Sequence, residues 1–196
     1  MFHDISDAML KRMNYLEEID RKDRHDGTPK NQRLRQIPPE TGRFISLMAA
    51  NCPTGEFIEI GTSAGYSTMW LSLAAKERNT KIKTFEILPE KARLARETIK
   101  TAGIENYVEL IEGDFLNEEK KIDDIAFCFL DAEKEIYERC FDLVLPKLIK
   151  NGFIVADNAI SHYEMIRPMI DKAEKDPGLD CLLVPIGKGE FVCRKK

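Results

Sequence analysis

The stretch that decides the fold reads IEIGTSAGYS, from Ile58 to Ser67. An apolar run that enters a glycine-containing turn is typical of a strand that passes directly into a helix. The centre of the stretch, GTSAG, fits two patterns: the G-x-S-x-G turn that presents a nucleophilic serine in hydrolases, and a glycine turn that approaches a cofactor. These two interpretations require different surroundings, so the rest of the chain discriminates between them.

Short apolar runs alternate with longer amphipathic segments on the C-terminal side of this turn. The runs that predict strands are 56–60, 82–87, 107–112, 125–130, 152–157, 179–186 and 190–195. The segments that predict helices are 66–78, 89–102, 137–149 and 163–175. Nearly continuous apolar strands separated by helices indicate a parallel sheet covered on both faces, and the short GKG segment before the last run indicates an antiparallel hairpin. We therefore expect a doubly wound, mostly parallel α/β fold that ends in a C-terminal hairpin.

The N-terminal part of the chain has a different pattern. Apolar residues three and four apart predict a helix that begins near Ser6, and a second helix is expected over 39–50. Between them, segment 21–36 carries six Lys or Arg against two Asp, which is typical of a solvated linker or of a nucleic-acid contact. We expect one domain over 1–196, in which 1–52 form a helical lid or dimerisation segment on a cofactor-binding core of 53–196.

Composition narrows the class of protein. The chain has 196 residues and a formal net charge of −4, so it lacks the global basic field of many nucleic-acid binders. Its five cysteines contain no C-x-x-C pair, which fits a reducing cytoplasm better than a disulfide framework or a zinc site. A cationic leader and an 18-residue apolar run are both missing, and we therefore expect a soluble protein without a membrane partner.

The hydrolase interpretation of GTSAG lacks its structural context. A serine nucleophile at Ser63, with His162 as the candidate base, needs an earlier strand to supply the oxyanion loop, and the first convincing strand is the one that enters the motif. The dinucleotide fingerprint would need glycine where Ser63 stands, and no G-K-[ST] follows. What remains is E-x-G-x-x-x-G, over 59–65, as a cofactor turn.

Acidic residues end the next three predicted strands. Glu86 ends the second, Asp114 follows the third, and Asp131 ends the fourth. Ligands of doubly wound sheets bind at this carboxyl edge, and an acid at the end of the second strand is placed to accept the hydroxyls of a ribose. Any one of these acids could instead be a helix cap or a solvated strand end, but together they favour a cofactor crevice.

These residues resemble a known family. The segments EIGTSAGYS, EGDF, LDAEK and ADN (156–158), together with Glu86, resemble class I S-adenosylmethionine-dependent methyltransferases, specifically the cation-dependent O-methyltransferases that include catechol and caffeoyl-CoA O-methyltransferases. The resemblance runs from Ile37 to the C-terminus. It implies a Rossmann-like, seven-stranded sheet, S-adenosylmethionine as cofactor, a divalent cation and a homodimer.

The resemblance also implies site residues. Glu59, Gly61, Thr62 and Ser67 would bind the methionine moiety of the cofactor. Glu86 would hold the ribose, Asp114 and Phe115 would border the adenine, and Ile37 would line the cofactor from above. Asp131, which is shared with the cofactor site, would ligate the cation with Asp157 and Asn158, and Asp131 and Lys134 would be the catalytic residues.

The ligand chemistry supports the metal assignment independently. Two carboxylates and one amide carbonyl suit a hard cation such as Mg²⁺, with Ca²⁺ or Mn²⁺ as alternatives. The competing interpretation is that Asp157 and Asn158 only turn the chain out of a strand. Lys134 resembles the family's proposed base, with an ordinary surface lysine as its alternative, and Tyr137 is expected to pack.

The acceptor is less constrained. A small catechol-like or phenolic molecule with vicinal oxygens fits cation chelation, whereas a hydroxynucleoside in tRNA would use the basic 21–36 segment. A cofactor-binding module without catalysis is a third alternative, which the intact catalytic and metal motif argues against. Lys188 and Glu190 stand where many bacterial members of the family carry Asp and an apolar residue, so the substrate rim of this chain is unusual.

Overall fold

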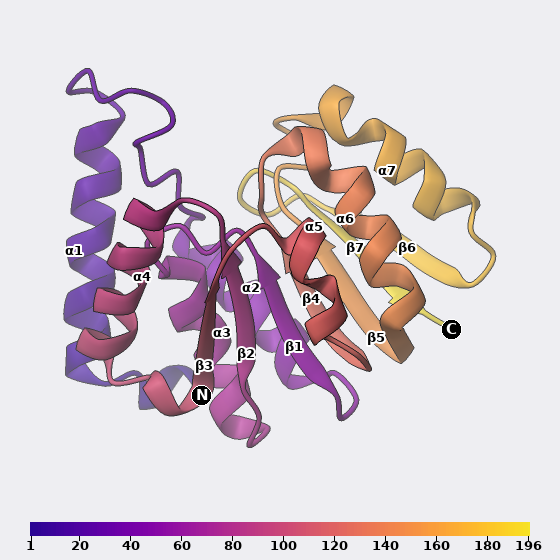
Figure 1. The fold of residues 1–196 in the computed structure, drawn as a ribbon, viewed down its shortest axis with the longest axis horizontal. Coiled ribbons are helices and arrows are strands. Elements are labelled where there is room, and N and C mark those ends of the chain that lie inside the picture. The colour runs from indigo at the N-terminus through magenta and orange to yellow at the C-terminus, as the bar shows by residue number, and fades with distance from the viewer.

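The computed structural model describes residues 1–196 apart from the side chain of Glu119, and it has one seven-stranded sheet in the order β3-β2-β1-β4-β5-β7-β6 (Figure 1). The strands are β1 (Glu56–Ile60), β2 (Ile82–Glu86), β3 (Val108–Glu112), β4 (Ile125–Leu130), β5 (Leu148–Ala156), β6 (Leu179–Val184) and β7 (Glu190–Lys195). Strands β1 to β5 pair in parallel, and β7 pairs antiparallel with both β5 and β6. The predicted fold class is confirmed.

Strand β5 begins earlier than the predicted 152. The Asn-Gly pair at 151–152 has the composition of a turn, yet it forms an irregularity inside the strand. Asn151 has a φ of 66°, and the pairing with β4 shifts register between Ile125 and Phe127. A left-handed residue at such an irregularity lets the strand continue on both sides of it, so the local turn signal was misleading here.

The helices are α1 (Asp7–Asp23), α2 (Pro39–Ala50), α3 (Tyr66–Glu77), α4 (Pro89–Ala102), α5 (Phe115–Glu118), α6 (Tyr137–Val144) and α7 (Tyr163–Lys175). Helix α6 is shorter than the predicted 137–149 because Pro146 lies in the 3₁₀ turn Leu145–Lys147 that follows it. Proline lacks the N–H that a continuing helix would use. Helices α5, α6 and α7 lie on one face of the sheet, and α2 and α3 lie on the other (Figure 1).

The alternation of side chains along the central strands produces two cores. Phe57, Phe127 and Val155 face the core shared with α2 and α3. Ile58, Cys128 and Ile154 face the core shared with α6 and α7. Residues one apart in a strand point to opposite faces, so strands that are apolar throughout form the middle layer of a three-layer domain.

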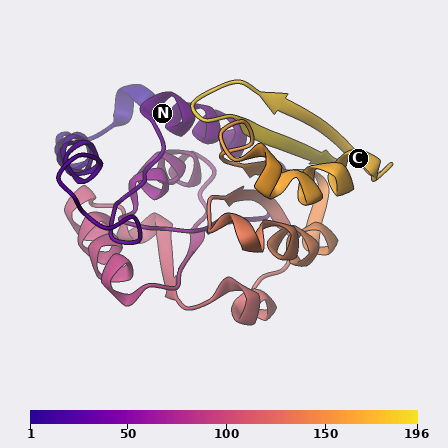
Figure 2. The same cartoon turned by 90° about the horizontal axis from the view of Figure 1, so that it is seen from above.

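Helix α1 covers the edge of the domain opposite the C-terminal hairpin (Figure 2). The Ser6 hydroxyl accepts a hydrogen bond from the Met9 N–H at 3.2 Å, which satisfies one of the free donors at the start of the helix. Buried Arg12 extends from α1 to α4, where it donates to the Thr98 hydroxyl at 3.0 Å and to Glu97 at 2.8 Å. The predicted N-terminal helices are therefore present and packed onto the core.

The basic segment between α1 and α2 is shorter and better anchored than the sequence suggested. Helix α1 continues to Asp23, and two acids of its last turns bind the following backbone: Asp23 accepts from the Leu34 N–H at 2.7 Å, and Asp20 accepts from the Gln36 N–H at 3.1 Å. Leu34 is only 5% exposed. Residues 24–33 are mostly exposed, as a solvated linker predicts, whereas the two ends of the 21–36 segment are anchored to the domain.

In the described part of the chain, none of the helices combines the length and apolar character that crossing a membrane requires. All five cysteines are free thiols, as expected.

Candidate active site

A cavity of about 900 Å³ lies at the carboxyl ends of β1 to β4, bordered by the segment that follows α1. Ten of the predicted site residues line it: Ile37, Gly61, Thr62, Ser67, Glu86, Asp114, Phe115, Asp131, Lys134 and Asn158. Two predicted residues, Glu59 and Asp157, are buried and do not line the cavity. The sheet therefore brings side chains separated by more than a hundred positions in the sequence to one crevice.

The glycine turn between β1 and α3 forms the floor of this crevice. Gly61 has a φ of 102°, and a Cβ there would lie 2.3 Å from the Asp131 carbonyl oxygen. Gly65, with a φ of 83°, caps the start of α3. Only glycine combines this backbone conformation with such close approach, and the free N–H groups of the first helical turn suit a carboxylate ligand.

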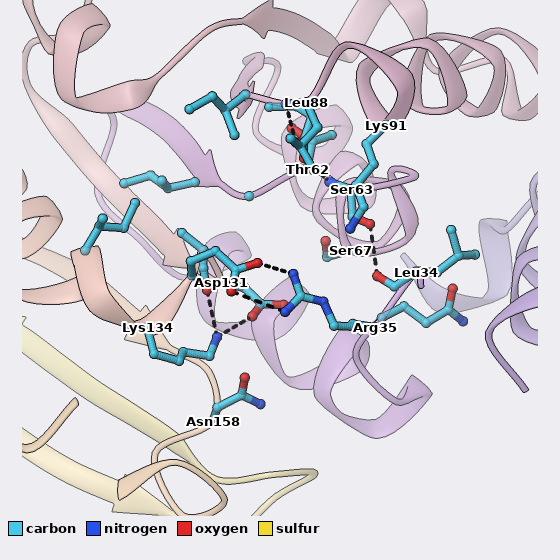
Figure 3. Close-up of a pocket in the computed structure, with 18 of the residues that line it drawn as sticks. Leu34, Arg35, Thr62, Ser63, Ser67, Leu88, Lys91, Asp131, Lys134 and Asn158 are labelled. Atoms are coloured by element: carbon cyan, nitrogen blue, oxygen red, sulfur yellow. Dashed lines mark hydrogen bonds and ion pairs between the residues drawn. The ribbon is translucent and has the colours of Figure 1, made fainter. Parts of the chain in front are cut away.

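Ser63 is held as part of this turn. Its N–H donates to Glu86 Oε2 at 2.7 Å, and its hydroxyl donates to the Leu34 carbonyl at 2.9 Å (Figure 3). His162, the candidate base of the hydrolase interpretation, pairs instead with the neighbouring Ser161 hydroxyl at 2.9 Å. Ser63 therefore fastens the N-terminal segment to the pocket, and the serine-nucleophile alternative is wrong.

Glu86 presents a buried carboxylate at the end of β2. It accepts from the Leu88 N–H at 2.9 Å through Oε1 and from Ser63 through Oε2, which leaves a lone pair on each oxygen for hydroxyl groups. Burial raises its pKa. Burial also lowers the pKa of Lys91, a pocket residue on α4 that the sequence did not single out.

Glu59 does not face the crevice. Its side chain is fully buried under α3, and Oε2 accepts from the hydroxyls of Thr68 at 2.5 Å and Thr84 at 2.6 Å. Burial raises its pKa to about 7. Glu59 is therefore not among the residues that line the crevice, and its contact with the methionine moiety of the cofactor stays a prediction. The residue supports the turn from behind because it faces α3.

The fourth and fifth strands bring the candidate metal ligands together. The Asp131 N–H donates to the Ile60 carbonyl at 2.9 Å, and the Asp157 N–H donates to the Leu130 carbonyl at 3.0 Å, so both residues continue the parallel ladders. Asn158, the next residue, takes a φ of 68° and lines the cavity. All three predicted ligands therefore meet at one edge of the sheet.

The donor set fits a hard cation. Asp157 is buried, and its side chain is in hydrogen-bond contact with the buried carboxyl group of Glu190. Burial, with Asp131 as the second cause, raises the pKa of Asp157 to about 6. Among the described residues no three His, Cys, Asp or Glu side chains form a metal cluster, so the candidate set is two carboxylates and one amide. A divalent cation would offset the repulsion between the carboxylates of Asp131 and Asp157.

Lys134 is not a surface lysine, because its side chain is only 11% exposed. Its ammonium group donates to Asp131 Oδ1 at 3.0 Å, to the Ala132 carbonyl at 2.9 Å and to the Tyr137 hydroxyl at 2.7 Å. Tyr137 is fully buried, and its hydroxyl lies 3.0 Å from the Leu130 carbonyl that it can donate to. Tyr137 therefore packs, as expected, and it also positions Lys134.

Glu190 is a buried acid whose location the sequence did not reveal. Phe191 pairs with Ala156, so the next pair along the antiparallel ladder places Glu190 opposite Asp157. Its Oε1 accepts from the Thr41 hydroxyl at 3.2 Å, and its carboxyl group is in hydrogen-bond contact with Asp157. Burial, followed by the charge of Asp157, raises the pKa of Glu190 to about 10. The predicted hairpin pairs Glu190 with Val184, so the contact with Asp157 depends on the separate pairing of β5 with β7.

The N-terminal segment closes one side of the crevice through an ion pair between Arg35 and Glu133. Figure 3 shows the Arg35 guanidinium directed toward the Asp131 and Lys134 group. The hydrogen bond from Arg35 lowers the pKa of Glu133. The pair joins the segment before α2 to the end of β4, and such a contact between distant positions has no local sequence signal.

A doubly wound sheet with a glycine turn after β1, an acid ending β2 and an oxygen cluster after β4 and β5 defines a Rossmann-like cofactor-binding domain. The family model described as O-methyltransferase matches residues 6–196. The chain therefore belongs to the O-methyltransferase family, and it is an S-adenosylmethionine-dependent O-methyltransferase.

Curated relatives agree with this membership. The chain is 33% identical over 159 residues to catechol O-methyltransferase of Niastella koreensis, a match that covers 79% of this chain and 66% of the relative. It is 27% identical over 161 residues to catechol O-methyltransferase of Mycobacterium tuberculosis, covering 76% and 73%. It is also 27% identical over 181 residues to caffeoyl-CoA O-methyltransferase of Medicago sativa, covering 80% and 73%.

Solved structures share the fold. A SAH-bound methyltransferase of Podospora anserina has a TM-score of 0.80 at 22% identity, covering 98% of this chain and 89% of that one. The O-methyltransferase of Bacillus cereus, solved in complex with SAH, has a TM-score of 0.78 at 20% identity, covering 95% and 91%.

Proposed function

We propose that this O-methyltransferase, assisted by a divalent cation, methylates a hydroxyl of a small catechol-like or phenolic acceptor with vicinal oxygens. The observation that carries the proposal is the meeting of Asp131, Asp157 and Asn158 beside Lys134 at one end of the cofactor crevice. An all-oxygen set that contains two neighbouring carboxylates favours Mg²⁺, with Ca²⁺ and Mn²⁺ as alternatives.

The cofactor is proposed to lie along the crevice from the glycine turn to Phe115. The first turn of α3, with Gly61, Thr62 and Ser67, would receive the methionine carboxylate. Glu86 would accept the ribose hydroxyls through its free lone pairs. Asp114 and Phe115 would border the adenine, and Ile37 would cover the cofactor from the N-terminal segment.

The chemistry is a direct displacement. The acceptor oxygen forms a bond to the sulfonium methyl carbon as the sulfur–carbon bond breaks, which leaves a neutral thioether. A bound divalent cation supplies a lowered pKa at the acceptor hydroxyl and a fixed orientation of the vicinal oxygens. Lys134 is proposed to act as a neutral amine that takes the hydroxyl proton at Nζ, after which the resulting ammonium donates to the three oxygens around it.

The arrangement of the chain is part of the proposal. Residues 1–52 are proposed to act as a lid on the core of 53–196, since Leu34, Arg35 and Ile37 border the crevice. The homodimer implied by the family resemblance is also proposed, with residues 1–52 at its interface. Light scattering would measure the mass, and a monomer at micromolar concentration would contradict it. Free cysteines are consistent with the proposed cytoplasmic location.

The test is transfer from methyl-labelled S-adenosylmethionine to catechol, to caffeoyl-type phenols and to bulk RNA, each with and without a chelator. We expect labelled small phenols, and we expect the label to be lost with the chelator. Labelling of RNA alone would instead favour the tRNA hydroxynucleoside alternative, whose binding would weaken steeply with salt. Binding of the cofactor without transfer to any acceptor would favour the non-catalytic alternative.

A further inference from the structure

Three side chains from separate segments surround the end of the pocket next to Asn158. Lys30 comes from the segment between α1 and α2, His162 precedes α7, and Lys188 lies in the turn between β6 and β7. All three line the same cavity as Asn158 and Lys134. The backbone N–H of His162 donates to the backbone carbonyl of Asn158 at 2.9 Å, so His162 lies directly beside this candidate metal ligand.

The two lysines lack counterions. In the described part of the chain neither Lys30 nor Lys188 forms an ion pair. The pocket carboxylates Asp131 and Glu133 are already paired with Lys134 and Arg35. Glu86, Asp114 and Glu135 also line the pocket without an ion pair among the described residues, but the lining has eight Lys or Arg against six Asp or Glu, so its charge is positive. A chain of net charge −4 thus concentrates unpaired cations at this place.

Lys30, His162 and Lys188 line one cavity, and an anion that enters it would be attracted by both lysines.

The backbone holds Lys188 firmly in this position. Its carbonyl accepts from the N–H groups of Ile160 at 3.1 Å and Ser161 at 3.0 Å. The flanking glycines permit the tight approach: a Cβ on Gly187 would lie 2.2 Å from the Thr41 hydroxyl oxygen, and a Cβ on Gly189 would lie 2.5 Å from Ile160 Cγ1. The Lys188 backbone is therefore fixed against the turn that carries Asn158 and His162.

We propose that the methyl acceptor carries an anionic group, a carboxylate or a phosphate, which Lys188 and Lys30 bind beside His162 while the vicinal oxygens lie at the Asp131 end of the pocket. The inference rests on the proposed function and specifies the substrate class of the same site. Ammonium groups bind either anion through charge-assisted hydrogen bonds. The favoured acceptor is therefore a dihydroxyphenyl acid, and a neutral catechol or a catecholamine is disfavoured.

The test compares kcat/KM for four acceptors: 3,4-dihydroxybenzoate, 3,4-dihydroxybenzylphosphonate, catechol and 3,4-dihydroxyphenethylamine. We expect the better of the two anionic acceptors to exceed catechol by on the order of tenfold, and the amine to be the poorest. The carboxylate and phosphonate arms distinguish the two sources of negative charge. Equal kcat/KM for catechol and for both anions would overturn the inference while leaving the O-methyltransferase proposal intact.

Substitutions of the two lysines test whether these residues cause the preference for anionic acceptors. Lys188→Gln is expected to lower kcat/KM for the preferred anion about tenfold more than for catechol, and Lys188→Glu to shift preference toward the amine. Lys175→Gln, an exposed lysine at the end of α7, is the matched control and should keep the wild-type preference. If both Lys188→Gln and Lys30→Gln keep the wild-type preference for the anionic acceptor over catechol, the inference would also be overturned.

If no acceptor is methylated, the proposed function is contradicted. A binding measurement then still tests the inference that the pocket binds an anion. Calorimetric titration of the wild-type protein with 3,4-dihydroxybenzoate should give a Kd about tenfold lower than that in Lys188→Gln, and the difference should shrink as salt is added. Identical Kd values in the two proteins would contradict the inference.

Discussion

The hydroxyl oxygen of Tyr137 lies 2.7 Å from the Lys134 ammonium nitrogen, and the same hydroxyl lies 3.0 Å from the Leu130 carbonyl at the end of β4. The Asp157 carbonyl is a second oxygen in reach, at 3.2 Å. Tyr137 therefore connects the candidate proton acceptor to the two strand ends that carry the candidate cation ligands. Burial raises the pKa of Tyr137 well above its usual value, so the phenol stays protonated.

Removing the Tyr137 hydroxyl should misplace Lys134. We expect Tyr137→Phe to lower kcat by about tenfold, as loss of one hydrogen bond to a charged group predicts, while the Kd for S-adenosylmethionine changes less than about twofold. Tyr163→Phe, at a partly exposed tyrosine, is the control. Single-turnover kinetics with calorimetry measure both quantities, and an unchanged kcat in Tyr137→Phe would contradict the positioning role.

Gly61 should tolerate no side chain. Gly61→Ala places a Cβ at 2.3 Å from the Asp131 carbonyl oxygen, so the turn must move. We expect loss of detectable cofactor binding and destabilisation of about 3 kcal/mol or more. Gly27→Ala is the matched control: its φ is also positive, at 87°, but nothing lies within 4 Å of the added carbon, so only about 1 kcal/mol of backbone strain is expected. Equal unfolding free energies for the two variants would contradict the steric account.

Glu59 should make stability depend on pH. Burial raises its pKa from 4.5 to about 7, so the folded state binds a proton that the unfolded state has lost between these values. The stabilisation is therefore complete below pH 4.5 and is lost as the pH rises toward 7. Between pH 5 and 8, the unfolding free energy of the wild type should decrease by up to about 3 kcal/mol, and Glu59→Gln should abolish this decrease. Urea titrations at both pH values measure this, with exposed Glu174→Gln as the control; parallel pH profiles for Glu59→Gln and wild type would refute it.

The ion pair between Arg35 and Glu133 should slow the opening of the N-terminal segment. We expect Arg35→Ala to raise the Kd for S-adenosylmethionine about threefold to fivefold, a modest effect because the pair is partly exposed. Arg33→Ala is the matched control, since Arg33 donates to the Thr28 carbonyl within the same segment. Equal effects of the two variants on cofactor dissociation, followed by stopped flow, would argue against the lid.

The parts of the site that follow from local patterns were predictable. The glycine turn and the acids at successive strand ends could be placed from the sequence because parallel strands bring their carboxyl ends to one edge. The same logic predicts that Asp131 lies next to Asp157. The residue types at these positions then indicated an oxygen-ligand site.

The parts that depend on packing between distant segments were not predictable. Glu59 turns toward α3 and its threonine partners because the alternation of β1 gives it that face, which a motif match ignores. The Arg35 and Glu133 contact needs the path of the chain between α1 and α2, which no periodicity specifies. Strand β5 starts before the predicted 152 because residues 148–151, most of which the prediction leaves to the end of a helix or a connection, belong to the strand, which pairs with β4 through an irregularity at Asn151.

The most direct test of the central claim is the rate of methyl transfer to a 3,4-dihydroxyphenyl acceptor, measured in protein treated with chelator and then titrated with Mg²⁺. The account predicts no transfer before the titration, saturable recovery in the wild type and in exposed Asp171→Ala, and no recovery in Asp157→Ala. Transfer that persists at the wild-type rate in excess chelator, or that Asp157→Ala retains, would contradict cation-assisted catalysis at this site.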